Sequence, residues 1–373
     1  MNKIIKNASR LILVFAFIYL LFFFWVNKER YVRPYDYTYF GNLYSESQYV
    51  KGELTKGGIG DDGLYAFAGY YYIRGGDVSQ VNFENPPLGK YLIGLSILLF
   101  NNERAINILY SLLLLFVVYH LAHQLTKNSL LSSVAASILS VDPLVTSQHL
   151  LSMLDIPMIV FFITGIIFYI KAAKSSKPLV LLIYSSLFFS ISFATRFFPI
   201  LPLILVVLTL GLRKKGKRYF LPFFISWCIF LPLVYLLSYI MYFFYHPSFW
   251  EFLRYQNWII HWRLQNPIKF GNIFSTLLFG RYQTWWENPV WLVSSDWTVL
   301  TGIITIVGFV GLIRWFKRYP HKILTILCIL YVVYLAIGTV GVAKFILPVY
   351  PILIICAVDT FFVNLRGILT KHG

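Results

Sequence analysis

The sequence predicts an all-α polytopic membrane protein, a single bundle of about ten transmembrane helices. Three observations predict this fold class. The chain of 373 residues is 58% hydrophobic and only 13% charged, whereas a soluble domain is about half apolar and about a quarter charged. Long apolar runs recur along the chain, and basic residues gather in every second segment between them.

A helix needs about 20 mostly apolar residues to cross the hydrocarbon core of a bilayer. Ten stretches approach this length, of which the third and the sixth are short. We expect the first to be a retained span, because it ends in bulky aromatic residues and has no small-residue cleavage site. The expected spans are residues 10–27, 105–125, 129–147, 154–171, 178–195, 197–212, 219–244, 294–313, 323–342 and 345–364.

The distribution of charge supports this arrangement of spans. With the N-terminus in the cytoplasm, the cytoplasmic segments hold 18 of the 32 basic residues, and the outward segments hold 14 of the 15 acidic residues, Asp359 being the exception. This separation follows the positive-inside rule. The net charge of +17 is therefore a topology signal, and no nucleic-acid partner is needed to explain it. We expect both termini to lie in the cytoplasm and the chain to reside in the cell (inner) membrane.

Two outward segments, 28–104 and 245–293, are long. The first contains Leu64–Ile73 and Leu88–Phe100, apolar stretches too short to span, which suit two interfacial helices. The second holds most of the segment from Trp250 to Trp297, which contains seven of the ten tryptophans. These form either an aromatic belt at the headgroup level or a platform for a sugar or lipid head. We expect one domain over 1–373, with no C-terminal soluble domain.

Ionisable residues cluster at the outer ends of the expected spans. Arg104, Asp142, Asp155, Arg196 and Lys344 all lie there. Charge at the membrane midplane is costly, and proton relays and channels more often place ionisable groups there. The pattern instead indicates a polar chamber at the outer interface.

Two motifs lie in the first outward segment. Asp61-Asp62 follows a glycine-rich stretch and precedes an interfacial helix, so the pair is either a helix N-terminal cap or a source of the general base. The segment Asn85-Pro86-Pro87-Leu88-Gly89-Lys90 sets an extended entry to the next helix and places Lys90 one turn into it. Taken alone, this second motif is a turn with an interfacial lysine.

Taken together, these motifs resemble the protein O-mannosyltransferase family of the GT-C glycosyltransferase superfamily. The spacing of Asp61-Asp62, Tyr71-Tyr72-Ile73-Arg74-Gly75 and Asn85-Pro86-Pro87-Leu88-Gly89-Lys90 is similar to that of the family's Asp-Glu, Tyr-Tyr-Ile-Lys-Gly and His-Pro-Pro-Leu-Gly-Lys motifs. Residues 147–155 (SQHLLSMLD), 194–196 (ATR) and 344–348 (KFILP) resemble later family segments in the same order.

The resemblance implies a GT-C-like bundle that moves a sugar, mannose, from a polyprenyl-phosphate carrier to an acceptor hydroxyl on the outer face. Asp61 would be the catalytic base and Asp62 its neighbour, while Asp155 would lie near the donor or acceptor. The phosphate would draw on four cations, and Asn85 would contact substrate. Those cations are Lys90, Arg104, Arg196 and Lys344.

The chain also departs from the family pattern. Asp62 replaces a glutamate, Asn85 replaces a histidine, and Leu150 occupies the place of an arginine. These differences, and the absence of a luminal carbohydrate-binding domain, leave the acceptor open between protein, lipid and glycan. A single displacement at the anomeric carbon predicts inversion, since retention would need a second carboxylate as nucleophile.

No cofactor is required by the sequence. A divalent metal ion, if one binds, would use Asp61, Asp62 and Asp155, because carboxylates suit hard cations. Two other function classes stay open: a transporter or flippase of a lipid-linked saccharide, and a non-catalytic membrane partner in an envelope complex. The first predicts flux without transfer, and the second predicts that changes at Asp61 and Asp62 are tolerated.

Overall fold

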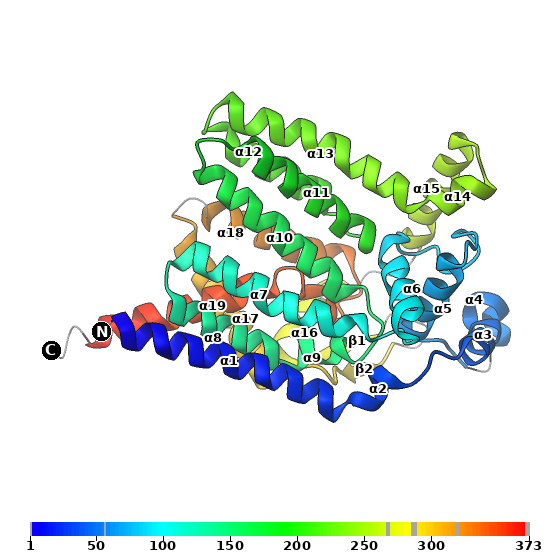
Figure 1. Cartoon of the computed structure of the whole chain (residues 1–373), viewed down its shortest axis with the longest axis horizontal. Helices are drawn as coiled ribbons and strands as arrows, with labels where there is room; N and C mark the ends of the chain where they lie inside the picture. The colour runs from blue at the N-terminus through cyan, green and yellow to red at the C-terminus, as the bar shows by residue number, and fades with distance from the viewer. Residues whose placement is uncertain (1, 56, 266–268, 285–288, 318–320, 370–373) are drawn as a thin grey trace.

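The computed structural model describes residues 2–55, 57–265, 269–284, 289–317 and 321–369. Within these ranges the chain is almost wholly helical, with one short pair of antiparallel strands. The long helices lie roughly side by side along the longest axis of the molecule, and a layer of shorter helices covers one end of them (Figure 1).

Each expected span has a helical counterpart. Five of these helices are long and apolar enough to cross a membrane, or six if one bent pair is counted as a single span, within the part of the chain described above. The bundle helices are α1 (Asn2–Val26), α7 (Ile106–Thr126), α8 (Ser129–Val141), α9 (Pro143–His149), α10 (Asp155–Lys174), α11 (Leu179–Thr195), α12 (Leu201–Arg213), α13 (Lys217–Ser238), α17 (Val299–Trp315), α18 (His321–Gly338) and α19 (Tyr350–Leu369).

The expected span 129–147 is two helices, α8 and α9, which meet at an angle of 59°. Asp142 lies between them in an extended conformation and accepts a hydrogen bond from the backbone of Leu144 at 2.9 Å. Pro143 occupies the first position of α9, where its missing N–H costs nothing. The Asp-Pro pair therefore ends one helix and starts the next, which the apolar pattern alone did not predict.

The remaining elements are the short ones of the two outward segments, together with α14 at the end of α13 and η2 before α19. They include both expected interfacial helices, α5 and α6, at the end of the bundle opposite to the start of α1 and the end of α19 (Figure 1). The elements are α2 (Lys28–Val32), α3 (Tyr37–Ser45), α4 (Gln48–Lys51), η1 (Gly52–Leu54), α5 (Asp61–Ile73), α6 (Leu88–Phe100), α14 (Ile240–Tyr245), α15 (Phe249–Leu264), α16 (Asn272–Phe279), β1 (Arg281–Gln283), β2 (Trp291–Val293) and η2 (Ala343–Ile346).

Glycines set the close packing of α5 and α6. A Cβ atom at Gly69 would lie 2.7 Å from the carbonyl oxygen of Lys90, and one at Gly94 would overlap the carbonyl of Gly69. A Cβ atom at Gly89 would overlap the carbonyl of Thr195 at the end of α11. The two helices thus approach backbone to backbone, and α6 packs against the end of α11.

Candidate functional site

Asp61 and Asp62 occupy the first turn of α5, directly after Gly60. Carboxylates are stabilised near helix N-termini, where the macrodipole is positive. The expected capping role is therefore compatible with this position. Asp61 nevertheless keeps 40% of its side chain exposed, so its carboxylate is also open to a reactant.

Lys344 forms an ion pair with Asp61. Its ammonium nitrogen donates to Oδ2 of Asp61 at 2.6 Å, although 283 residues separate the two in the chain. Burial by itself raises the pKa of a carboxyl group, but the ammonium of Lys344 and the guanidinium of Arg196 outweigh this and lower the pKa of Asp61. Asp61 is therefore ionised at neutral pH.

Arg196 and Asp155 form a second ion pair. Asp155 begins α10 and is fully buried, and Arg196 directly follows α11. The guanidinium of Arg196 also lies over the ring of Phe345 at 5.4 Å, one residue after Lys344. The start of α10, the end of α11, η2 and the start of α5 thus bring four of the expected site residues into one charged cluster, namely Asp61, Asp155, Arg196 and Lys344.

Arg104 lies beside the other carboxylate of the pair. Its guanidinium is 3.8 Å from Asp62 and 3.4 Å from Glu103. The two carboxylates of the Asp61-Asp62 motif therefore face different cations, Lys344 for the first and Arg104 for the second. This arrangement separates the adjacent negative charges.

Asn85 is buried and links two parts of the cluster. Its amide nitrogen donates to the hydroxyl of Tyr65 at 3.0 Å, and its amide oxygen accepts from the backbone of Phe197 at 3.2 Å. Tyr65 lies one turn after Asp61 on α5, and Phe197 follows Arg196. The expected substrate contact of Asn85 has no support in this geometry, because both ends of the amide are used to hold the site together.

Lys90 is also committed to the protein. It is fully buried, and its ammonium nitrogen donates to the backbone carbonyls of Asn82 and, at 2.6 Å, of Asn85. Burial lowers the pKa of Lys90 well below its ordinary value. These contacts make Lys90 a support of the loop before α6, whereas we had expected it among the cations available to a phosphate.

The second tyrosine of the Tyr71-Tyr72 motif supports the same loop. The hydroxyl of Tyr72, which has one proton to donate, lies within hydrogen-bonding distance of the carbonyls of Val78, Val81 and Asn82. The ammonium of Lys90 lies 5.3 Å from the centre of the Tyr72 ring. The motif residues after Asp61-Asp62 therefore build the scaffold on which Asn85 is presented.

The comparisons with known proteins fit this arrangement. The sequence profile of a family described as dolichyl-phosphate-mannose-protein mannosyltransferase matches residues 84–242. Among solved structures, ArnT from Cupriavidus metallidurans in the apo state superposes with a TM-score of 0.59 at 13% identity, over 87% of this chain and 59% of that one. ArnT bound to undecaprenyl phosphate gives 0.61 at 18% identity, over 82% and 56%.

The oligosaccharyltransferase of Archaeoglobus fulgidus in the apo form also superposes, with a TM-score of 0.51 at 13% identity, over 98% of this chain and 52% of that one. No curated protein sequence matches the chain. The chain shares the fold of these solved structures, and the family profile matches less than half of its length. The chain spans between about half and three fifths of the length of the solved structures it matches, and it is a multi-pass membrane protein.

Two residues that the sequence motifs did not indicate lie beside the cluster. Glu84 directly precedes Asn85 and accepts a hydrogen bond from the hydroxyl of Tyr49 at 2.7 Å. Arg263 of α15 donates to the backbone carbonyl of Glu84, and its guanidinium lies 4.2 Å from the centre of the Phe197 ring. Glu84 directly precedes the motif that begins at Asn85, so its place in the sequence could have indicated it. No sequence signal places Arg263 near that motif.

A metal site at Asp61, Asp62 and Asp155 does not form among the residues that the structure describes. No group of three or more His, Cys, Asp or Glu side chains in those ranges converges as metal ligands. The physical reason is that each of the three carboxylates lies against its own cation, Lys344, Arg104 or Arg196. The donor set therefore does not fit a divalent ion in this arrangement.

The tryptophans of the second long outward segment have different surroundings. Trp258 and Trp262 of α15 pack against Phe83, with ring centres 4.5 and 5.0 Å apart, and so cover the loop before Asn85. Trp250 and Trp291 are exposed, whereas Trp285 and Trp286 lie outside the described residues. Of the five tryptophans of the segment that the structure describes, Trp258 and Trp262 thus pack on the loop before Asn85, and Trp258 remains 48% exposed.

Proposed function

We propose that this chain is a membrane glycosyltransferase that moves a sugar from a polyprenyl-phosphate carrier to an acceptor hydroxyl. One observation carries the proposal. An ionised and accessible carboxylate, Asp61, stands at the start of an outward helix within a cluster of cations that includes Lys344 and Arg196. A carboxylate beside concentrated positive charge suits a reaction in which a hydroxyl is activated and a phosphate leaves.

In this proposal, Asp61 is the general base. The acceptor oxygen forms a bond to the anomeric carbon while the bond from that carbon to the phosphate oxygen breaks. The electron pair of the broken bond leaves with the polyprenyl phosphate, and the hydroxyl proton passes to Asp61. One displacement inverts the anomeric centre, since the reaction has no covalent sugar intermediate.

The cations stabilise the charge that grows on the leaving phosphate. Arg196 presents the planar fork that binds phosphate oxygens in pairs, and Lys344 acts as a point charge. We also assign Arg263 to this group, because its guanidinium lies over Phe197, next to Arg196. Asp155 orients Arg196 through their ion pair.

The proposed reaction takes place on the outer face of the membrane. The separation of basic and acidic residues along the chain supports cytoplasmic termini, and the first turn of α5 lies at the end of the bundle opposite to the start of α1 (Figure 1). A carrier anchored by its isoprenoid chain presents sugar and phosphate at this interface, where Asp61 and the cations lie.

For the sugar we propose mannose, which is the sugar in the description of the matching family. The acceptor is a protein, lipid or glycan hydroxyl. Undecaprenyl phosphate, which one of the solved ArnT structures holds, supplies the carrier for the first assay. Other sugars on the same carrier form the next panel.

The test is transfer of radiolabelled mannose from its polyprenyl phosphate to a mixed acceptor extract by the purified protein. We expect transfer by the wild type and a loss of about 10²- to 10⁴-fold in Asp61→Asn. Asp36→Asn is the matched control, because Asp36 is an exposed cap of α3 and asparagine caps equally well. Equal transfer by wild type and Asp61→Asn rules out the proposed base, and flux of the carrier across vesicles without any transfer favours a transporter.

A further inference from the structure

The short helix α4 contacts the loops that lead into both sequence motifs of the proposed site. The side chain of Gln48 forms two hydrogen bonds with the backbone of Ile59, accepting from its N–H at 3.1 Å and donating to its carbonyl at 3.4 Å. The next residue, Tyr49, donates from its hydroxyl to Oε1 of Glu84 at 2.7 Å. Ile59 lies two residues before the Asp61-Asp62 motif, and Glu84 directly precedes the second motif.

Helix α4 is itself fixed to the elements around it. Ser47 directly precedes α4 and is fully buried. Its hydroxyl donates to the carbonyl of Tyr44 on α3 at 2.6 Å and accepts from the backbone N–H of Tyr49 at 3.3 Å. The ring of Tyr44 stacks in turn on Phe67 of α5, with ring centres 4.9 Å apart. Because α4 is anchored in this way, its side chains can hold other segments in place.

The contact of Gln48 fixes the start of α5. The chain enters α5 through residues 57–60 (GGIG), and the three glycines of this stretch have wide backbone freedom. Ile59 is buried, and a Cβ atom at Gly63 would lie 3.2 Å from its Cγ1, so the Ile59 side chain lies over the first turn of α5. With its backbone held by Gln48, Ile59 sets the point at which the helix and Asp61 begin.

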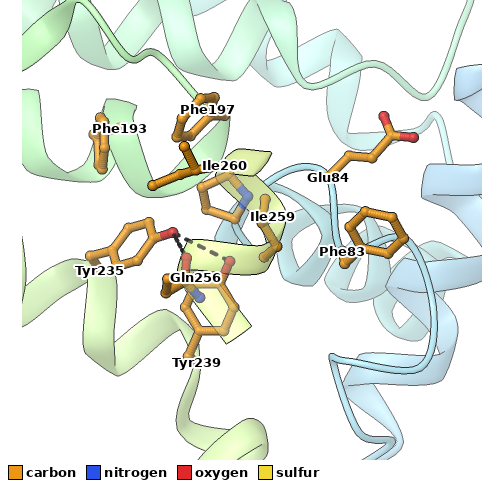
Figure 2. Close-up of a pocket in the computed structure, with 10 residues that line it drawn as sticks. Phe83, Glu84, Phe193, Phe197, Tyr235, Tyr239, Gln256, Ile259 and Ile260 are labelled. Atoms are coloured by element: carbon orange, nitrogen blue, oxygen red, sulfur yellow. Dashed lines mark hydrogen bonds between the residues drawn. The ribbon is translucent and has the colours of Figure 1, made fainter. Parts of the chain in front are cut away.

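The contact of Tyr49 holds the loop before α6 through the side chain of Glu84. Figure 2 shows the Glu84 carboxylate directed away from Tyr235 and Tyr239 of the neighbouring cavity. Burial raises the pKa of Tyr49, and the charges of Glu84 and Asp61 raise it further. The hydroxyl of Tyr49 therefore stays protonated at neutral pH and remains the donor to Glu84.

We propose that Gln48 and Tyr49 are positioning residues of the transfer reaction, which hold the base Asp61 in a fixed place relative to the loop of Asn85. This inference rests on the proposed function. Asn85 binds the backbone that follows Arg196, so α4 also sets the base relative to a phosphate cation. Misplacing a catalytic group by about 1 Å can lower a rate about 10²-fold, and both side chains act through the groups that they bind.

Steady-state transfer kinetics of Gln48→Ala and Tyr49→Phe test this. Each variant should lower kcat about 10- to 100-fold, with a smaller change in the KM of the donor, because the loss falls on the transition state. Gln80→Ala and Tyr39→Phe are the matched controls, since both side chains are exposed. The two controls should keep the kcat of the wild type.

The pH profile and a conservative variant separate positioning from a general loss of stability. In Gln48→Ala, Asp61 is held less firmly against Lys344, so the acidic limb of kcat/KM should move to higher pH. A variant that is merely less stable would lose rate without moving this limb. Gln48→Glu keeps an acceptor for the N–H of Ile59 and should recover part of kcat.

The double variant of Gln48→Ala and Tyr49→Phe tests whether the two side chains act together. Both act on the placement of Asp61 relative to the loop of Asn85, so the loss in kcat should be smaller than the product of the two single losses. A loss equal to that product would mean two independent contacts and would overturn the shared role of α4.

Hydrogen exchange of the full chain in detergent gives a readout that does not depend on transfer. Gln48→Ala should speed exchange at residues 57–64, and Tyr49→Phe should speed it at residues 82–87, each about tenfold, with the rest of the chain as in the wild type. Unchanged exchange at both segments, or faster exchange throughout the chain, overturns the inference.

The outcomes separate this inference from the proposed function. Wild-type kcat and pH profile in Gln48→Ala and Tyr49→Phe, in a protein whose transfer still depends on Asp61, overturn the positioning role alone. No transfer by the wild type counts against the proposed function, and the positioning role then fails with it, even where local exchange rises as expected.

Discussion

The ammonium of Lys344 lies 2.6 Å from the carboxylate of Asp61, so residues from opposite ends of the chain share one ion pair at the end of the bundle that carries α5. The pair lowers the pKa of Asp61, which keeps it ionised at neutral pH but also makes it a weaker base. In the proposed reaction, a substrate phosphate that draws Lys344 away would make the carboxylate more basic. Activation of the acceptor would thereby be coupled to occupancy of the proposed phosphate site.

This coupling leads to a prediction for the pH dependence of the reaction. Because Lys344 lowers the pKa of Asp61, the ionised and active form of Asp61 persists until the pH falls through this lowered pKa. Lys344→Met removes the largest cause of the lowering, so the acidic limb of kcat/KM should move to higher pH. The maximal rate should also fall about a hundredfold, because one charged contact to the leaving phosphate is lost.

The pH profile of kcat/KM for wild type, Lys344→Met and Lys344→Arg checks this. Arginine keeps the positive charge, so its acidic limb should stay near that of the wild type. If the limb of Lys344→Met does not move, or moves to lower pH, then Lys344 does not govern the protonation of the base.

Asn85 is expected to position Arg196. Asn85→Ala would leave the buried hydroxyl of Tyr65 and the backbone N–H of Phe197 without their partners, at about 1–3 kcal/mol for the groups left unpaired. Without this link, Arg196 should be misplaced relative to the leaving phosphate. The value of kcat should therefore fall, with a smaller change in KM for the acceptor. A histidine, which the resembling family has at this place, should restore part of both stability and kcat.

Thermal unfolding in detergent and steady-state kinetics of Asn85→Ala and Asn85→His provide the measurement. Asn42→Ala, at an exposed position of α3, is the control and should change stability by less than about 0.5 kcal/mol. A fully stable Asn85→Ala with normal kcat and raised donor KM would instead place Asn85 in direct contact with substrate.

Much of this fold could be predicted from local pattern. The apolar runs and the alternation of basic and acidic segments gave the helical bundle and the two short helices of the first outward segment, because both are properties of contiguous residues. The short length of α12 was visible in the sequence, but the bend at Asp142 was not, since an Asp-Pro pair interrupts an apolar run without changing its composition. The helices match the expected spans in order but not at every boundary.

The site was predictable only as a set of residue types. Asp61, Asp155, Arg196 and Lys344 lie in one charged cluster, because the start of α5, the start of α10, the end of α11 and η2 meet there. Their roles in substrate binding and catalysis stay predictions. The structure separates Lys90 from this group, since a lysine that follows Asn85-Pro86-Pro87 by one turn folds back onto the carbonyls of its own loop. Arg263 was invisible because only tertiary packing of α15 brings it to Phe197.

Gly94 should be intolerant of any side chain. A Cβ atom there would overlap the backbone of Gly69 on α5, and backbone cannot move aside as a side-chain end can. Gly94→Ala should therefore destabilise the protein by about 1–3 kcal/mol through overpacking, despite the better helix propensity of alanine. Because α5 carries Asp61, transfer activity should fall as well.

Thermal unfolding of Gly94→Ala and Gly57→Ala tests this. Nothing lies within 4 Å of a Cβ atom built at Gly57, so the control should match the wild type. If Gly94→Ala is as stable as the control, α5 and α6 are not packed backbone to backbone in the membrane.

The last prediction concerns Glu84 and is a pH dependence of the folding stability. Its sign is opposite to the one expected for a carboxyl whose pKa is lowered, such as that of Asp61. Burial raises the pKa of Glu84 above its ordinary value of 4.5, and the charge of Asp61 adds to this, although Tyr49 and Arg263 oppose it. A carboxyl whose folded pKa is raised binds its proton more tightly in the folded state than in the unfolded state. Its contribution to the unfolding free energy is therefore most favourable below the unfolded value and is lost as the pH rises through the folded pKa.

Glu84→Gln cannot ionise and keeps an acceptor for the hydroxyl of Tyr49. The melting temperature of Glu84→Gln relative to the wild type should therefore rise between pH 4 and pH 7, so that the variant is at least as stable as the wild type at neutral pH. Glu53→Gln, at an exposed position of η1, controls for placing an amide on the outward surface. A difference that is flat or falls with pH would mean that Glu84 is better stabilised as an anion, in which case its carboxylate, and not only its backbone, is paired with Arg263.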